Sequence, residues 1–382
     1  MMTLNGNIVS GDAAFFGTLT VQKDRIDRIA MSGPVREDAE WILPGFIDVH
    51  LHGIYHGDAT PEAVHLMAEE GVQSGLTAFC PTMASDLPER MLAFVEAVRE
   101  LVLSPRPGRV KVAGSHLEGP YMEYVHRGGM NETMIRDPDP AEVRRLLDAA
   151  RGTLRIMTIS PELPGAPEVI RLLAAHGVLV SGGHTGLRPE KVADFIAAGG
   201  KAFCHLFDAY DGRDVAGGVT QTSLADAVLV DDRLFVEVIG DGIHVQPTLV
   251  KLAVRAAGPE RILGITDSMC GTGLPDGSYP MTDAGRAYTL KSGDVGRLVD
   301  DPSVIVGSCL TQNRAFYNYT VKFGFAPETA AQVLATTPAR YLGLAEQGEL
   351  REGFLADLAV LAPDRLTVRK TVIGGEVVYE QN

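Results

Sequence analysis

The chain has 382 residues, of which 45% are apolar and 22% are charged, and its formal net charge is −15. This length predicts one large domain with a small appendage, and the composition is that of an ordinary soluble globular protein. The negative charge argues against nucleic acid or an anionic membrane as a partner, because both attract basic surfaces. We therefore expect the partner to be a small-molecule substrate.

The four cysteines lie far apart and form no CxxC pair, which is typical of reduced, mostly buried thiols in a cytoplasmic protein. The first residues, MMTLNGNIVSGDAAFF, contain neither the basic segment nor the apolar segment of a signal peptide. No apolar run approaches the ~20 residues that a membrane span needs. We expect a soluble protein of the cytoplasm. The cysteines are Cys80, Cys204, Cys270 and Cys309.

Short β-type runs stand at the beginning of the chain, at Asn7–Ser10, Gly17–Val21 and Arg25–Ala30, with Gly and Asp turns between them. The last residues repeat this pattern in ADLAVLAP, LTVRKTVIGG and EVVYE. The two ends could form independent hairpins, but such hairpins are marginally stable at this size. We predict instead one small β-sandwich domain built from residues 1–43 and 347–382.

The middle of the chain alternates short apolar β-type runs with amphipathic helical segments. Eight such alternations over residues 44–346 predict a (β/α)8 barrel. A doubly wound open sheet is the alternative, but it does not require a polar cluster after nearly every apolar run. The apolar runs are WILPGFIDVH, LTAFCPTM, RVKVAGSHLEG, LRIMTISPE, GVLVSGGHT, KAFCHLF, LFVEVIGDGIHV and RILGITDSM. The helical segments include Pro61–Ser74, Leu87–Val102, Ala141–Ala150, Ala166–His176, Arg188–Ala198 and Pro247–Ala256.

Residues with metal-binding or acid–base side chains stand at or just past the carboxyl end of these predicted strands. In a barrel those ends meet at one face, where active sites are built, so residues far apart in sequence can share one pocket. These residues are His50, His52, Glu118, His184, His205, His244 and Asp267.

His50-Leu51-His52 is the sharpest local motif, because residues i and i+2 of a strand point to the same side and can reach one cation. An HxH pair alone is weak evidence, but Pro44-Gly45 before it and Gly53 after it place it at a strand end.

The other candidate ligands each have an ordinary structural alternative. Glu118 could cap a turn before Gly-Pro, and His184 could open a helix. His205 could be a hydrogen-bonded core histidine, and Asp267 could cap the next segment. Taken together, five strands that each end in a ligand-type residue favour a metal site. Imidazole and carboxylate suit Zn²⁺, with Fe²⁺ or Mn²⁺ as alternatives.

A metal at this site makes hydroxide available at neutral pH and polarises an amide carbonyl. A carboxylate must also take a proton from water and pass it to the leaving nitrogen. We assign that role to Asp267.

With these motifs, the chain resembles the N-acetylglucosamine-6-phosphate deacetylase family of the amidohydrolase superfamily over nearly its whole length. The resemblance implies a metal-dependent hydrolase that deacetylates an N-acetyl amino sugar, with one or two divalent ions per chain and a possible homodimer. It rests on LPGFIDVHLHG (43–53), HLEGPY (116–121), SGGHTG (181–186), HLFDAY (205–210), DGIHV (241–245), ITDSM with GLPDG (265–277), VGSCLT (306–311) and TPARYLGL (337–344).

By this resemblance Glu118, His184 and His205 hold a metal, and His50 and His52, which some family members lack, imply a second one. Asp267 takes the position of the family's proton-shuttling aspartate. The positions that match the family's substrate contacts are His244, Gly129, Asp208, Ala209, Ile305, Val306 and Gly307.

Three departures from the family pattern concern the substrate. Met130 stands where the family has a histidine that polarises the carbonyl, and His126 is the nearest substitute. Asp208 replaces an asparagine, and its carboxylate would repel a phosphate. The family's phosphate-binding arginine has no match in register, although Arg213 lies near.

These departures keep a second function open: an amidohydrolase of the same build that acts on an unphosphorylated N-acyl sugar or N-acyl amino acid. A cyclic amidase resembling dihydroorotase ranks lower, because Glu118 stands where those enzymes commonly use a carboxylated lysine. A non-catalytic barrel should show gaps in its metal set, and this chain shows none.

Overall fold

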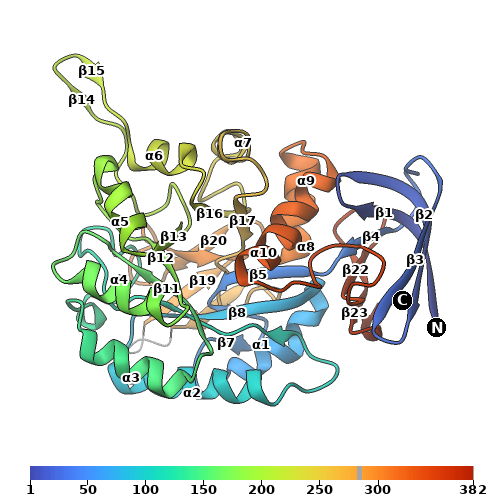
Figure 1. Ribbon diagram of the computed structural model, residues 1–382, viewed down its shortest axis with the longest axis horizontal. Coiled ribbons are helices and arrows are strands. Elements are labelled where there is room, and N and C mark those ends of the chain that lie inside the picture. The colour runs from blue at the N-terminus through green and yellow to red at the C-terminus, as the bar shows by residue number, and fades with distance from the viewer. Residues whose placement is uncertain (282–285, 382) are drawn as a thin grey trace.

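The computed structural model describes residues 1–281 and 286–381, and its centre is a barrel of parallel strands surrounded by helices (Figure 1). The strands of the barrel are almost completely buried, which explains their continuous apolar sequence. Within the described residues the barrel strands pair in the order β5 (Phe46–Leu51), β8 (Leu76–Ala84), β10 (Ser115–Glu118), β11 (Leu154–Ile159), β12 (Leu179–Gly182), β13 (Gly200–Phe203), β16 (Phe235–Ile239) and β17 (Ile262–Ile265).

Hydrogen bonds between the end of β5 and the residues that follow β17 join the first strand to the last. The backbone N–H of Asp267 donates to the carbonyl of His50 at 2.9 Å, and the N–H groups of His52 and Gly53 donate to the carbonyl of Ser268 at 2.8 and 2.9 Å. These bonds close the ring on the side where the predicted site residues lie. The predicted (β/α)8 fold class is confirmed.

Helices follow the barrel strands and pack apolar faces onto them. In α2 the buried side chains are Met91, Phe94, Val95 and Val98, at the spacing of one helix face. The segment predicted as a single helix over Pro61–Ser74 is a short helix followed by a 3₁₀ turn. Helix α6, whose N-terminus has a Ser223–Asp226 capping box, was not predicted from the sequence. The helices are α1 (Val64–Glu70), α2 (Pro88–Leu103), α3 (Pro140–Ala150), α4 (Ala166–Ala175), α5 (Val192–Ala198), α6 (Leu224–Val230) and α7 (Pro247–Ala257), with 3₁₀ turns at Gly71–Ser74, Glu132–Met134 and Pro189–Lys191.

After β17 the chain forms a small antiparallel sheet that the sequence analysis did not predict. Its strands are β18 (Gly277–Pro280), β19 (Ala287–Leu290), β20 (Val295–Leu298) and β21 (Ile305–Ser308), and Tyr288, Leu290, Leu298 and Val306 form its own buried cluster. The helical segments that follow are α8 (Gln312–Tyr317), a π-helical turn at Asn318–Lys322, α9 (Pro327–Ala331), a second π-helical turn at Gln332–Thr336, and α10 (Thr337–Leu342).

Strands from both ends of the chain form one sheet at the side of the barrel (Figure 1). Strand β22 pairs antiparallel with β4, which in turn pairs parallel with β1. Ile8, Ile42 and Leu358 belong to one buried cluster, so the two ends share a core, as the sequence predicted. The boundaries at 43 and 347 remain a prediction. The order is β24 (Glu376–Glu380), β23 (Val368–Ile373), β22 (Leu358–Leu361), β4 (Trp41–Pro44), β1 (Met2–Ser10), β2 (Ala13–Gln22) and β3 (Arg25–Gly33).

A two-stranded hairpin, β14 (Val215–Ala216) and β15 (Val219–Thr220), extends away from the barrel (Figure 1). Its turn is Gly217-Gly218 with φ of 58° and 79°, a conformation that glycine adopts without strain. Val215 and Val219 are 69% and 62% exposed. Among the described helices, none has the length and apolar character needed to cross a membrane.

Candidate active site

Local backbone geometry brings the predicted ligands to the barrel mouth. His50 lies within β5, and Glu118 is the last residue of β10. His184, His205 and Asp267 each come two residues after their strand ends, with φ of 49°, 20° and 51°. Positive φ is rare for residues with a side chain and is concentrated at functional sites. The same backbone turn at three strand ends directs three side chains into one place.

Glu118 lies at the centre of a cluster of largely buried ionisable side chains. The other members are His50, His52, His184, His205 and Asp267. Its Oε1 atom lies 3.0 Å from His184 Nε2, 2.9 Å from His205 Nε2 and 3.5 Å from His50 Nε2. Its Oε2 atom lies 3.2 Å from His52 Nε2. One buried carboxylate therefore contacts four imidazoles, which come from three parts of the chain.

Asp267 lies on the other side of the two histidines of the HxH motif. Its Oδ1 atom is 3.1 Å from His52 Nε2 and 3.5 Å from His50 Nε2. These two Nε2 atoms are themselves only 3.4 Å apart. Two unprotonated imidazole nitrogens repel each other at this distance, so positive charge is needed between them.

The opposite nitrogen of each ring already has a partner. The Nδ1 atoms of His52 and His184 lie 2.9 and 2.8 Å from the carbonyls of Thr82 and His126, which can only accept hydrogen bonds. His205 Nδ1 lies 3.3 Å from the carbonyl of Asp208, and His50 Nδ1 lies 2.9 Å from Glu237 Oε2.

A proton on Nδ1 leaves the Nε2 lone pair free to bind a metal, and such oriented imidazoles are typical of metal sites. Two groups of donor atoms lie within 4.8 Å of one another and could each hold an ion: His50, Glu118, Cys204 and His205, and His50, His52 and Asp267. The residues present fit a site for divalent metal.

The pKa values of Asp267 and His52 are shifted in the directions that favour positive charge within the cluster. Burial favours the uncharged form of Asp267, but the hydrogen bond with His52 and the charges of the histidines outweigh it and lower its pKa to about 2. Burial likewise opposes charge on His52, yet hydrogen bonds with Asp267 and Glu118 raise its pKa to about 9. The carboxylates of Glu118 and Asp267 therefore stay ionised and favour positive charge between themselves and the histidines.

His116, which lies beneath the cluster, behaves in the opposite way. Burial, reinforced by the charge of His50, lowers the pKa of His116 to about 3. Its Nε2 atom lies 2.8 Å from the hydroxyl of Thr158, and its Nδ1 atom lies 3.0 Å from the carbonyl of Val49. His116 is thus a neutral, hydrogen-bonded core histidine.

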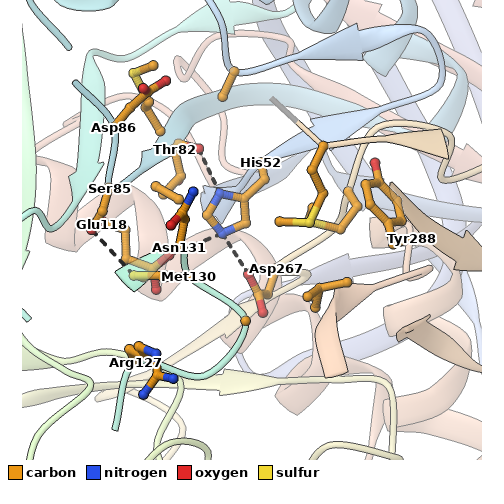
Figure 2. A pocket seen from close by; sticks show the side chains of 18 of the residues that line it. His52, Thr82, Ser85, Asp86, Glu118, Arg127, Met130, Asn131, Asp267 and Tyr288 are labelled. Atoms are coloured by element: carbon orange, nitrogen blue, oxygen red, sulfur yellow. Dashed lines mark hydrogen bonds and ion pairs between the residues drawn. The ribbon is translucent and has the colours of Figure 1, made fainter. Parts of the chain in front are cut away.

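An open pocket leads from solvent to the cluster. Figure 2 shows His52 at its centre, between the carbonyl of Thr82 and the carboxylate of Asp267. Met130 lies in this pocket, and the hydroxyl of Ser85 donates to its sulfur at 3.4 Å. The β18–β21 sheet supplies part of the wall through Pro280, Tyr288, Ile305, Val306 and Gly307.

The predicted substrate contacts divide into two groups. Gly129, Asp208, Ile305, Val306 and Gly307 line the pocket. His244, Ala209 and His126 are not among the described residues that line it. His244 Nδ1 lies 2.6 Å from Asp241 Oδ2, and the two ring nitrogens of His126 lie 2.7 Å from Glu123 and 3.0 Å from Asp211.

Arg213 lies at the base of the β14–β15 hairpin, where its Nε atom donates to Asp226 at 2.8 Å. Among the described residues that line the pocket, Arg127 is the single lysine or arginine. Its guanidinium stacks on the ring of Tyr124 at 4.1 Å and donates to the carbonyl of Tyr124 at 2.8 Å.

Glu237 and Cys204 also belong to the site, although the sequence did not predict them there. Cys204 Sγ lies 3.4 Å from His50 Nδ1 and 3.7 Å from Glu118 Oε1. The signal for Glu237 was available, because a glutamate in the middle of the apolar run LFVEVIG must be buried if that run is a barrel strand. Its partner, however, lies 187 positions away.

Comparison with known proteins agrees with this geometry. Residues 138–378 match the model of the amidohydrolase family. The chain is 31% identical to N-acetylglucosamine-6-phosphate deacetylase of Homo sapiens, covering 98% of this chain and 90% of that protein. It is 29% identical to N-acetylgalactosamine-6-phosphate deacetylase of Escherichia coli O157:H7, covering 85% of this chain and 84% of that protein.

Solved structures of related enzymes match this chain over nearly its whole length. A structure of N-acetyl-D-glucosamine-6-phosphate deacetylase from Mycobacterium smegmatis with N-acetyl-D-glucosamine-6-phosphate matches with a TM-score of 0.87 at 30% identity, covering 99% of each chain. The Thermotoga maritima N-acetylglucosamine-6-phosphate deacetylase matches with a TM-score of 0.87 at 28% identity, covering 100% of each chain. The chain belongs to the N-acetylglucosamine-6-phosphate deacetylase family of the amidohydrolase superfamily.

Proposed function

We propose that this enzyme removes the acetyl group of N-acetylglucosamine 6-phosphate, which gives glucosamine 6-phosphate and acetate. The observation that carries the proposal is the meeting of four imidazoles with Glu118 and Asp267 at the inner end of one open pocket. The named activity of relatives at about 30% identity over most of the chain supports this substrate.

The donor set supports divalent metal, with Zn²⁺ as the first choice and Fe²⁺ or Mn²⁺ as alternatives. Glu118, His184 and His205 would hold one ion, and His50 and His52 would hold a second with help from Glu118 or Asp267. When bound, the metal supplies Lewis-acid chemistry, which activates water at neutral pH and polarises the amide carbonyl.

Asp267 is the proposed catalytic base. Its carboxylate takes the proton of the attacking water and then gives it to the leaving amine nitrogen. Its Oδ1 atom lies 3.1 Å from His52 Nε2, so the carboxylate faces the proposed metal positions. Closure of the barrel beside Asp267 restricts its backbone, because its N–H donates to the carbonyl of His50.

The walls of the pocket would bind the sugar. Gly129 and Asp208 line one part of it, and Ile305, Val306 and Gly307 line another. His244 and Ala209 stay predicted substrate contacts through the family resemblance. His126 stays the predicted substitute for the histidine missing at Met130, although both of its ring nitrogens have carboxylate partners in the present structure.

A second candidate is an unphosphorylated N-acyl sugar or N-acyl amino acid. It is favoured by the carboxylate of Asp208 on the pocket wall and by the small number of basic side chains among the described residues that line the pocket. Arg127, the single lysine or arginine among the described lining residues, already contacts Tyr124. A phosphate group carries about two negative charges, so it gains little electrostatic attraction from a pocket wall that has the Asp208 carboxylate and a single lysine or arginine among its described residues.

We also propose a homodimer in the cytoplasm. The β14–β15 hairpin supports the dimer, since it extends from the barrel with two exposed valines, Val215 and Val219. Four free, widely spaced cysteines support a reducing compartment. The acidic surface supports a small molecule, rather than nucleic acid or a membrane, as the partner.

The test is a comparison of four substrates on the purified, metal-quantified enzyme: N-acetylglucosamine and N-acetylgalactosamine, each with and without a 6-phosphate. We expect kcat/KM for N-acetylglucosamine 6-phosphate to exceed that for the unphosphorylated sugar by orders of magnitude. Equal rates with and without phosphate would favour the second candidate. Turnover of none of the four, by an enzyme that holds metal, would contradict an N-acetyl amino sugar as substrate.

A further inference from the structure

Glu237 is a buried carboxylate in the middle of β16, and β16 contributes no other ionisable side chain. Its Oε2 atom lies 2.9 Å from His50 Nδ1, and neither side chain has any exposed surface. Its Oε1 atom is buried and has no hydrogen-bond partner among the described residues. A carboxylate that is buried with one partner is costly to the fold. Its retention inside the barrel therefore points to a role in the site.

His50 differs from the other imidazoles of the cluster in how its ring is held. The Nδ1 atoms of His52, His184 and His205 contact main-chain carbonyls, which no substitution of a side chain removes. The Nδ1 atom of His50 contacts the side chain of Glu237. The orientation of this one ring thus depends on a side chain that can be replaced.

The alternative partner of the same nitrogen is weaker. Cys204 Sγ lies 3.4 Å from His50 Nδ1, and a thiol is a weak hydrogen-bonding group. His116 limits the ring from another side, with the two ring centroids 4.7 Å apart, but it forms an edge contact only. Packing restrains the position of the His50 ring, whereas Glu237 selects which nitrogen carries the proton.

We propose that Glu237 is the positioning residue for the second metal position. By accepting a hydrogen bond from the Nδ1–H group, it fixes the tautomer of His50 whose Nε2 lone pair faces His52 Nε2 and Asp267 Oδ1, at 3.4 and 3.5 Å. The first metal position is formed by His184, His205 and Glu118. There the two histidine rings are held through Nδ1 by main-chain carbonyls rather than by Glu237. This inference rests on the metal site of the proposed function and adds that Glu237 governs occupancy of one of its two positions.

The experiment measures metal binding rather than turnover. Metal-free wild type, E237Q, E237L and H50A are titrated with Co²⁺, which is followed by its visible absorption, and with Zn²⁺, which is followed by elemental analysis. D357N is the matched control, because Asp357 is also a buried carboxylate, with Lys111 as its partner at 2.8 Å in a different part of the fold.

We expect wild type and D357N to bind two ions, and E237L to bind one ion with unchanged affinity and the second at least tenfold more weakly. Losses of about 10–100-fold are usual when a partner of a metal-binding histidine is removed. E237Q should show a smaller loss, because its amide oxygen can still accept a hydrogen bond from the Nδ1–H group of His50. H50A should lose the second ion, and adding E237L to H50A should change nothing further.

Two results would overturn the role of Glu237: tight binding of two ions by E237L, or equal weakening of both positions. Binding of a single ion by wild type would also overturn it. The proposed function is judged separately, because a wild-type enzyme that holds two ions without deacetylating amino sugars would leave the role of Glu237 intact.

Discussion

His184 Nε2 and Glu118 Oε1 lie 3.0 Å apart although 66 positions separate them in the sequence. His205 Nε2 reaches the same oxygen at 2.9 Å from 87 positions away. The barrel brings three strand ends together so that one carboxylate oxygen faces two imidazole nitrogens. This arrangement leads to the first prediction.

Replacing His184 or His205 with alanine should remove the first metal. Each change deletes one of the three proposed ligands of that ion, and the remaining donors hold it poorly. We expect zinc content to fall by about one ion per chain while the far-ultraviolet circular dichroism spectrum stays unchanged. H176A is a suitable control, because the ring of His176 lies at the end of α4 and hydrogen-bonds to the carbonyl of Leu172. Full metal content in H184A would contradict the assignment.

Replacing Asp267 with asparagine should separate chemistry from metal binding. The amide keeps the shape of the carboxyl group but cannot take a proton from water, so kcat should fall by roughly 10²–10⁴-fold. KM should change little. Metal content should stay at or above one ion per chain, because Glu118, His184 and His205 are untouched. Steady-state kinetics with elemental analysis tests both points, and unchanged kcat would remove Asp267 from the proposed role.

Replacing Asp208 with asparagine should change the preference for phosphate. If a phosphate lies against this part of the pocket, the carboxylate repels it, and removing that charge should raise kcat/KM for the 6-phosphate about tenfold. The unphosphorylated sugar should show no comparable gain, which makes it the internal control. A parallel rise for both substrates would show that Asp208 does not face the phosphate.

Metal removal should lower thermal stability, because the cluster places two carboxylates and four imidazoles close together without a metal ion between them. An ion present at 100 times its Kd stabilises the folded state by ~2.7 kcal/mol. Dialysis against a chelator should therefore lower Tm by several degrees, and Zn²⁺ should restore it. An equal Tm with and without metal, measured by scanning calorimetry, would contradict a tightly bound ion.

Changing Val215 and Val219 to aspartate should disrupt a dimer if the hairpin forms its interface. Both side chains are exposed and lie near the tip of an arm that extends from the barrel, so the change should leave the monomer fold intact. Sedimentation of the wild type as a dimer and of the double variant as a monomer is the expected result. A variant that stays dimeric would exclude this arm as the main interface.

The sequence by itself determined the parts that depend on local pattern. Short apolar runs predicted strands, and the alternation with helical segments predicted the barrel. The HxH spacing placed His50 and His52 on one side of a strand, because side-chain direction alternates with a period of two. The position of Glu118, His184, His205 and Asp267 at strand ends was enough to expect them in one place.

The tertiary structure alone decided which atoms meet. The β18–β21 sheet walls the pocket with Tyr288 and Val306, although its short strands carry a weak sequence signal. The tertiary structure also shows that His126 has carboxylate partners on both nitrogens and that Glu237, on β16, contacts His50. Such pairs depend on barrel closure and on rotamers, which the sequence constrains only through contacts between distant residues.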